Sequence, residues 1–161
     1  MSQENVEIVR RAIEASQRGQ GRYDILDPEV EWDFSAYAGL DVAPRGTGRE
    51  NFRRLMERYR RAWIDYQVAL KELIDARTEV VVVIHETDRL KQTEMLIERD
   101  LAQVWTLREG KVIRVRGYGT KQEALEAAGL PPEPPSRDAE EARKAFEAEL
   151  READAYRRRI S

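Results

Sequence analysis

The run of residues 101–130, LAQVWTLREGKVIRVRGYGTKQEALEAAGL, constrains the fold of this chain more than any other segment. Two alternating apolar stretches flank a short turn in which Gly110 supplies the positive φ that a tight hairpin needs. Thr120 and Glu123 then form a capping box at the start of a helix, and Gly129 is placed to end that helix. The run therefore predicts two strands joined by a tight turn and followed by one short helix.

The upstream sequence changes from helical to extended periodicity. Apolar residues recur at helical spacing over residues 3–18, and a second capping box at residues 47–50 opens another amphipathic segment. Further on, apolar and polar residues alternate with the period of two that is typical of strands. We expect helices over 3–18 and from the second capping box to about Tyr66, a short turn at 22–26, a loop at 38–46, and strands over 30–36, 67–76, 79–89, 94–107 and 111–118.

The segment PPEPP at residues 131–135 divides the chain, because proline can continue neither a helix nor a sheet ladder. A proline-rich segment of this kind is typical of a stiff linker. One more helix is expected after it, with many charges and a thin apolar stripe. The predicted organisation is a domain over 1–130, a linker over 131–135 and a charged C-terminal helix over 136–161, which we expect the domain not to need for folding.

Composition excludes several classes of function. Lys and Arg total 28 against 31 Asp and Glu, so the chain lacks the basic excess of a dedicated nucleic-acid-binding protein. The absence of cysteine removes thiolate chemistry, and a single histidine, His85, excludes a histidine-rich metal site. The N-terminus is polar, unlike a signal peptide, and the longest apolar run, residues 80–84, is far too short to span a bilayer. We therefore expect a cytoplasmic protein with no metal, cofactor, nucleic-acid partner or membrane partner.

The order helix, short helix, strand, helix and meander of long strands resembles the SnoaL-like branch of the NTF2-like superfamily. The resemblance covers roughly residues 5–130, and it is carried by LDPEVEW at 26–32, the hairpin at 104–112 and the ending at 118–130. It implies an α+β fold, a cone in which a strongly curved mixed β-sheet wraps around three to four helices, here with an appended C-terminal helix. It also implies an apolar pocket inside the cone and a homodimer formed through the outer sheet face. Relatives on this fold include ketosteroid isomerases, polyketide cyclases and limonene-1,2-epoxide hydrolases.

This resemblance suggests Asp33 as a catalytic residue, because it falls near the carboxylate that moves a proton in the isomerases. A carboxylate inside an apolar cup is desolvated, which raises its pKa and makes it a usable base. In the alternative interpretation, Asp33 lies at a strand end and meets water or caps a turn. The isomerase pattern is incomplete, since the first helix contains no tyrosine, and Asp100 would supply the second acid only if its strand points it inward.

The register of the strand over residues 94–107 decides which of its side chains face the pocket. A slip of one residue exchanges one set for the other, either Arg99, Leu101 and Gln103 or Asp100, Ala102 and Val104.

Alternation also separates two further candidates, because His85 and Glu86 are adjacent in one strand and only one of them can face the pocket. His85 would serve as a base or proton shuttle, since its side chain titrates near neutrality. Glu86 matches one acid of the Asp-Arg-Asp group of the epoxide hydrolases, but Ile84 and Gly117 occupy the other two positions. The resemblance therefore argues against epoxide hydrolysis.

We expect the pocket to hold a small apolar or ring-containing molecule. Its predicted lining combines aromatic side chains with a methionine and an arginine, namely Trp32, Phe34, Tyr37, Met56, Tyr59, Arg99 and Tyr118. Three functions stay open: binding alone, acid–base chemistry such as an isomerisation, cyclisation or dehydration with Asp33 as base, and a protein-interaction module. An acid at the base of a closed apolar cup favours chemistry, whereas a pocket filled by its own aromatic side chains favours the interaction module.

Overall fold

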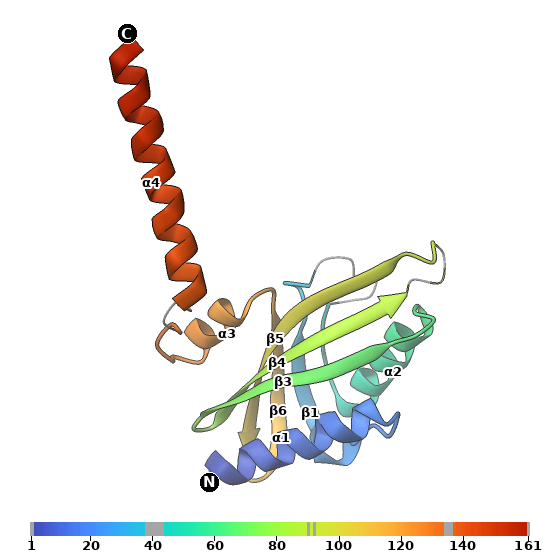
Figure 1. Cartoon of the computed structure of the whole chain (residues 1–161). Coiled ribbons are helices and arrows are strands. Elements are labelled where there is room, and N and C mark those ends of the chain that lie inside the picture. The colour runs from blue at the N-terminus through green and yellow to red at the C-terminus, as the bar shows by residue number, and fades with distance from the viewer. Residues whose placement is uncertain (1, 38–43, 90, 92, 134–136, 161) are drawn as a thin grey trace. The chain divides into compact units, whose positions relative to one another are not determined.

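The computed structural model describes residues 2–37, 44–89, 91, 93–133 and 137–160 (Figure 1). Most of the predicted loop at 38–46 lies outside these residues, as do Pro134 and Pro135 of the predicted linker. The chain divides into two compact units, Met1–Pro131 and Pro132–Ser161. The second unit contains one described helix, α4 (Arg137–Ile160), with exposed apolar side chains. That the first unit folds without the second stays a prediction.

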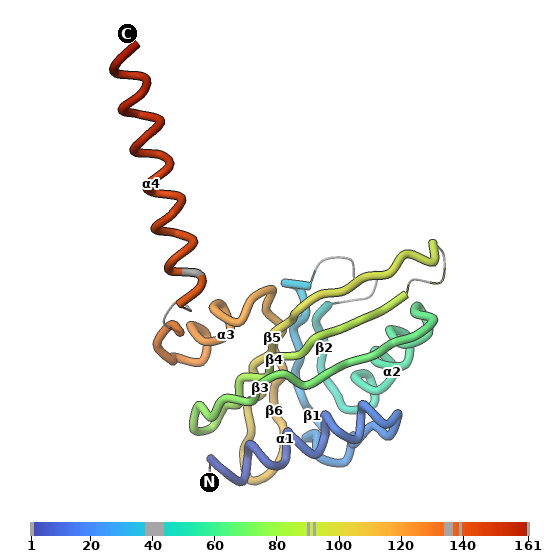
Figure 2. The backbone as a smooth tube through the Cα atoms, in the orientation of Figure 1, coloured from blue at the N-terminus to red at the C-terminus, as the bar shows by residue number. Residues whose placement is uncertain are grey.

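The first unit is built on a six-stranded sheet in the order β2-β1-β6-β5-β4-β3, in which β1 and β6 are parallel and all other neighbours are antiparallel. The long strands β3, β4 and β5 run side by side and curve together (Figure 2). The predicted α+β fold with a strongly curved mixed sheet is confirmed. The elements are α1 (Ser2–Gln17), the 3-10 turn η1 (Tyr23–Ile25), β1 (Leu26–Asp33), β2 (Arg45–Thr47), α2 (Arg49–Arg61), β3 (Gln67–Ala76), β4 (Glu79–Arg89), β5 (Leu96–Arg108), β6 (Lys111–Tyr118) and α3 (Lys121–Ala127).

Alternation along β4 divides the hydrophobic core between the two faces of the sheet. Val80 and Val82 face inward, where they join a core that includes buried residues of α1, α2 and β1. Val81 faces outward and packs against Ala124 and Leu125 of α3. All three valines are fully buried, and burying such a side chain contributes about 1.5–3 kcal/mol. The inner face of the sheet is therefore covered by this core, and α3 covers part of the outer face.

Helix α2 differs from its prediction at both ends. Thr47 belongs to β2 and provides no capping hydrogen bond, so the helix begins after Gly48, whose φ of 98° favours glycine. The helix ends at Arg61, earlier than predicted. Beyond the helix, the Ile64 N–H donates to the carbonyl oxygen of Arg89 on β4 over 2.7 Å. This tertiary bond ties the end of α2 to the end of β4.

The elements that follow the hairpin match their prediction closely. Gly110 and Gly129 have φ values of 76° and 72°, as the tight turn and the helix end require. Thr120 Oγ1 accepts a hydrogen bond from the Glu123 N–H over 3.2 Å and caps α3. The first strand is shifted, since β1 ends at Asp33, and β2 was missed because three residues are too few to show alternation.

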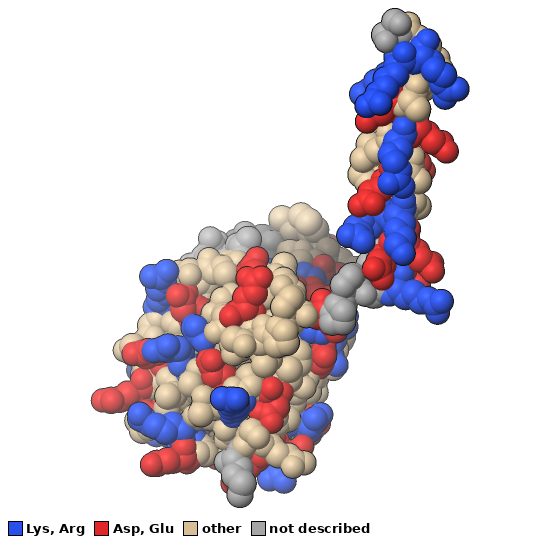
Figure 3. Space-filling model, turned by 90° about the vertical axis from the view of Figure 1, so that its left-hand side faces the viewer, with Lys and Arg blue, Asp and Glu red and all other residues tan. Residues whose placement is uncertain are grey.

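Acidic and basic side chains are interspersed on the face of the first unit that Figure 3 shows. Among the described helices, none has the length and apolar character needed to cross a membrane. The absence of a nucleic-acid partner stays a prediction.

Candidate functional site

A cavity of about 150 Å³ lies on the inner side of the curved sheet, with walls from α1, η1, α2 and the strands β1, β3, β4, β5 and β6. Most of its lining side chains are apolar. Seven are aromatic, among them Phe34, Tyr37, Tyr59, Tyr66 and Trp105. The cavity is therefore an apolar cup that its own aromatic side chains line without filling.

Glu86 is the acid that the fold places in this cavity. It lies on the inward face of β4, in step with Val82 and Ile84, and only 4% of its side chain is exposed. Arg99 Nε donates to Glu86 Oε2 over 3.0 Å, and the Tyr66 hydroxyl donates to Oε1 over 3.1 Å. A buried carboxylate needs such donors, because an unpaired charge in an apolar interior is costly.

The pairing of β4 with β5 settles the register that the sequence left open. Glu86 lies opposite Arg99, so Arg99 shares its inward face, and Gln103 further along β5 lines the cavity. Ala102 and Val104 face outward and pack against α3. Of the two alternatives, the set containing Arg99 points inward.

Two tyrosines complete the polar end of the cavity. The Tyr59 hydroxyl lies 3.3 Å from Glu86 Oε2, a long hydrogen bond, and accepts from Arg99 Nη2 over 2.6 Å. Burial, followed by the nearby Glu86 charge, raises the pKa of both the Tyr59 and the Tyr66 hydroxyl. Both therefore stay protonated and serve as donors. The sequence analysis missed Tyr66, because it lies in the short segment between α2 and β3, where no periodicity indicates a direction.

Asp88, which the sequence analysis also missed, is a second buried acid beside Glu86. It is two residues further along β4 and fully buried, and neither of its carboxylate oxygens has a hydrogen-bond partner among the described residues. Burial, and then the Glu86 charge, raises the pKa of the Asp88 carboxyl to about 6. Arg99 and the Gln67 backbone N–H, which is near the carboxyl but does not meet hydrogen-bond geometry, oppose the shift. The signal was present in the sequence: the inward alternation of β4 continues through Glu86 to Asp88.

Asp33, the predicted base, lies outside the cavity lining. Trp32 and Phe34 on either side of it are buried, so its own side chain points the other way and is 39% exposed. Asp33 Oδ1 accepts hydrogen bonds from the N–H and hydroxyl of Ser35, and Arg45 lies 3.2 Å from Oδ2. The Ser35 hydroxyl, with help from Arg45, lowers the pKa of the Asp33 carboxyl. This is the opposite of the shift expected for a desolvated base, because Asp33 is in the turn-capping arrangement.

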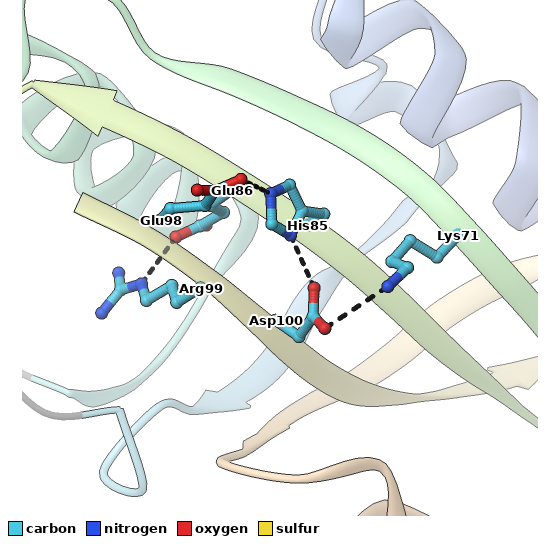
Figure 4. A network of polar contacts seen from close by, with 6 residues as sticks. All are labelled: Lys71, His85, Glu86, Glu98, Arg99 and Asp100. Carbon is cyan, nitrogen blue, oxygen red and sulfur yellow. Dashed lines mark hydrogen bonds and ion pairs between the residues drawn. The ribbon is translucent and has the colours of Figure 1, made fainter. Parts of the chain in front are cut away.

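His85 and Asp100 lie together on the outer face of the sheet, away from the cavity (Figure 4). His85 Nδ1 is 2.6 Å from Asp100 Oδ1, and Nε2 is 2.8 Å from Glu98 Oε1. Lys71 Nζ on β3 donates to the other Asp100 oxygen over 3.3 Å. The Asp100 and Glu98 carboxylates raise the pKa of His85, and His85 in turn lowers that of Asp100. The two residues form a surface ion-pair network, and neither reaches the cavity.

Some of the predicted ligand-binding residues line the cavity in the structure, and others lie outside it. Phe34, Tyr37, Met56 and Tyr59 line the cavity, and Arg99 supports it through Glu86 and Tyr59. Trp32 is buried behind this lining, where its ring packs edge-on against Phe52 with centroids 5.5 Å apart. Tyr118 lies on the outer face, beside α3 and 6.0 Å from the Arg116 guanidinium.

Within the described residues, no group of three or more His, Cys, Asp or Glu side chains is arranged to hold a metal ion. The polar end of the cavity is lined by the Glu86 carboxylate and the Tyr59 and Tyr66 hydroxyls, with Arg99 and Asp88 next to Glu86 but outside the lining. This arrangement suits hydrogen bonding and proton transfer.

Comparison with known proteins identifies the fold but gives no closer relative. No protein-family model matches the chain, and no curated protein matches it. In contrast, 203 chains of solved structures match it.

Three of these solved structures show the range of the likeness. An NTF2-like protein from Burkholderia thailandensis has a TM-score of 0.65 at 24% identity, covering 79% of this chain and 98% of that one. A protein from Jannaschia that is described as a SnoaL-like polyketide cyclase has a TM-score of 0.62 at 18% identity, covering 81% of this chain and 95% of that one. TerC, crystallised with polyporic acid, has a TM-score of 0.62 at 17% identity, covering 78% of this chain and 98% of that one.

Proposed function

Because this chain has the NTF2-like fold that SnoaL-like proteins share, we propose that it binds a small, ring-containing organic molecule in the cavity of the cone. The observation that carries this proposal is Glu86, a buried carboxylate that projects into a largely apolar cup and is held there by Arg99 and Tyr66. A ligand that fits the cup gains affinity from excluding water and orientation from this polar end.

The size of the cavity narrows the class of ligand. A cavity of about 150 Å³ is of the size that accommodates one benzene ring. A single ring with a short polar substituent therefore fits, whereas a molecule of several fused rings, such as a steroid, does not fit without rearrangement of the lining. TerC, which shares the fold, was crystallised with polyporic acid, and this supports the binding of an organic molecule by a protein of this fold.

The open state of the cup favours ligand binding over the alternative of a protein-interaction module. The seven aromatic side chains leave space between them, which would not be expected if the cone were only a scaffold. The homodimer and the cytoplasmic location stay predictions.

Acid–base chemistry is a second candidate function, and the buried acid favours it. Glu86, not Asp33, would be the base, taking a proton from the bound molecule and returning it at another atom of the same molecule, as in an isomerisation. Arg99 and the two tyrosines would remain as donors that stabilise negative charge developing on the substrate.

Binding can be tested with a variant that fills the cavity and a matched control. Val68 lines the cavity from β3, and its neighbour Ala69 is exposed on the opposite face of the same strand. Benzyl alcohol is the probe, and isothermal titration calorimetry is the measurement. We expect measurable binding by the wild type and by Ala69→Phe, and at least a tenfold loss in Val68→Phe. Unchanged affinity in Val68→Phe would show that the cavity is not the binding site.

A further inference from the structure

The polar end of the cavity carries more buried negative charge than positive charge. Glu86 and Asp88 are two residues apart on the inward face of β4, which places their backbones about 7 Å apart. Arg99, opposite Glu86, bonds to Glu86 but not to either oxygen of Asp88. Two carboxylates therefore share one guanidinium, and a buried acid without hydrogen bonds is costly to keep unless a ligand or proton offsets it.

None of the other ionisable groups in the cavity lining bonds to Asp88. Tyr59 and Tyr66, which face the two acids from α2 and the segment after it, are neutral donors. Arg22 and Arg60 line the cavity nearer α1 and η1. Arg22 is held by Asp24 through bonds of 2.8 and 2.9 Å, and Arg60 donates to the Ser16 hydroxyl over 2.9 Å.

The aromatic part of the lining is suited to a cation. Aromatic rings attract cations through the negative potential of their faces, and recognition of ammonium groups by several rings around one site is a common arrangement. Here, several aromatic side chains surround the space into which Glu86 projects. They are Tyr59 of α2, Tyr66 before β3, Trp105 of β5 and Phe34 after β1. Tyr59 and Tyr66 pack edge-on, with ring centroids 5.4 Å apart.

We propose that the cavity takes a small organic cation, an amine that is protonated or fully alkylated and carries no more than one ring, with its charge directed at the Glu86–Asp88 end. This inference rests on the proposed function and specifies its ligand class. The ammonium group lies against the rings of Tyr59 and Tyr66 and is balanced by the acid pair, of which Arg99 neutralises only one member. A neutral or anionic ring of the same size would leave Asp88 without a counter-charge.

Three probes of nearly equal size separate the ligand classes: benzylammonium, benzyl alcohol and benzoate. We expect titration calorimetry at pH 8 to give benzylammonium at least about tenfold tighter binding than benzyl alcohol, because the attraction between a full charge and nearby carboxylates is only weakly screened in a partly buried site. Benzoate should bind most weakly. Equal binding of the first two probes, or tightest binding of benzoate, would overturn the cation proposal and leave ring binding intact. If none of the three binds, the proposed function fails.

Asp88→Asn tests the source of the preference. We expect the ratio of benzylammonium to benzyl alcohol affinity to fall by about tenfold in this variant. Asp100→Asn, on the outer face of the neighbouring strand, is the matched control and should keep the wild-type ratio. A ratio that survives in Asp88→Asn would overturn the role given to Asp88.

The pH dependence provides a test that needs no variant. A bound cation favours the ionised form of Asp88, so benzylammonium affinity should be full above about pH 7 and fall as the pH is lowered through 6, where that carboxyl titrates. The charged groups that face Asp88 are Glu86 and Arg99, and Arg99 does not titrate in this range. Benzyl alcohol affinity should change far less over the same range. Benzylammonium affinity that does not depend on pH between 5 and 8 would contradict the proposal.

Discussion

Glu86 on β4 lies directly opposite Arg99 on β5, and the two side chains form an ion pair of 3.0 Å with 4% and 23% of their surfaces exposed. The strand register alone makes this contact possible, because both residues are on the inward face. The desolvation of two charges largely offsets their attraction, so such a pair adds little to stability but costs much when one partner is removed.

Removal of the Arg99 guanidinium should destabilise the protein. We expect Arg99→Met to lower the free energy of unfolding by about 3–5 kcal/mol, because it leaves Glu86 buried without its counter-charge. The double variant Glu86→Gln with Arg99→Met should recover most of this loss. Arg114→Met breaks an exposed pair with Glu31 and serves as the control, with an expected loss below about 1 kcal/mol. Urea unfolding measures all four proteins, and a loss in Arg99→Met no larger than in the control would contradict the prediction.

Asp88 should make the protein less stable as the pH rises. The pKa of its carboxyl is raised from 3.8 to about 6 in the folded state, so its ionisation opposes folding. Stability is then highest below about pH 4 for this group and declines as the pH rises through 6, by at most about 3 kcal/mol. Asp88→Asn should remove this dependence and be more stable than the wild type at pH 8. Melting temperatures of both proteins from pH 4 to 8 test this; parallel curves would show that Asp88 does not titrate in the folded state as inferred.

His85 provides a titration that can be assigned without ambiguity, since it is the chain's single histidine. Its pKa should lie above 6.5 because Asp100 and Glu98 stabilise the protonated ring. We expect the midpoint of its NMR titration to fall in Asp100→Asn and to stay unchanged in Asp33→Asn, a distant acid. The stability that this network contributes is present below the unfolded pKa and is lost as the pH rises through the folded pKa. A midpoint at or below 6.5 in the wild type would be inconsistent with the ion pairs described.

Asp33→Asn distinguishes the predicted base from the cavity acid. Asp33 holds the turn after β1 through Ser35, so the variant should lower the melting temperature modestly, most clearly above the pKa of this carboxyl. Its benzyl alcohol affinity should stay within about twofold of the wild type, whereas Glu86→Gln should change it several-fold in either direction. Calorimetry with both variants provides the comparison. If Asp33→Asn loses binding and Glu86→Gln does not, Asp33 is part of the binding site.

Truncation tests the division of the chain. A chain ending at Pro131 keeps every strand and the three helices of the first unit, including the Gly129 turn that closes α3. We expect it to unfold cooperatively at nearly the same urea concentration as the full chain. The isolated C-terminal segment should be only partly helical, because a helix alone in water lacks the tertiary packing that provides most helical stability in proteins. An insoluble or non-cooperative truncated chain would show that α4 contributes to the core.

The sequence predicted the fold better than it predicted the residues of the site, and the reason is geometric. Side chains alternate along a strand, so the face of every residue is known once the face of one residue is known. The sequence of β5 did not show which of its residues faces the cavity. The observed Glu86–Arg99 pairing supplies it. The position of Asp33 was inferred from family resemblance, and the burial of Trp32 and Phe34 on either side reverses its direction.

The sequence by itself determined the elements whose signals are local. The glycine at 110 sets the hairpin, Thr120 and Glu123 set the start of α3, and the consecutive valines of β4 favour a strand, because each of these preferences acts within a few residues. Only the tertiary structure decided that Glu86 and Asp88 share a buried end with Arg99 and two tyrosines. That outcome depends on strand register, sheet curvature and the point at which α2 meets β4, which are set by contacts between residues far apart in the chain.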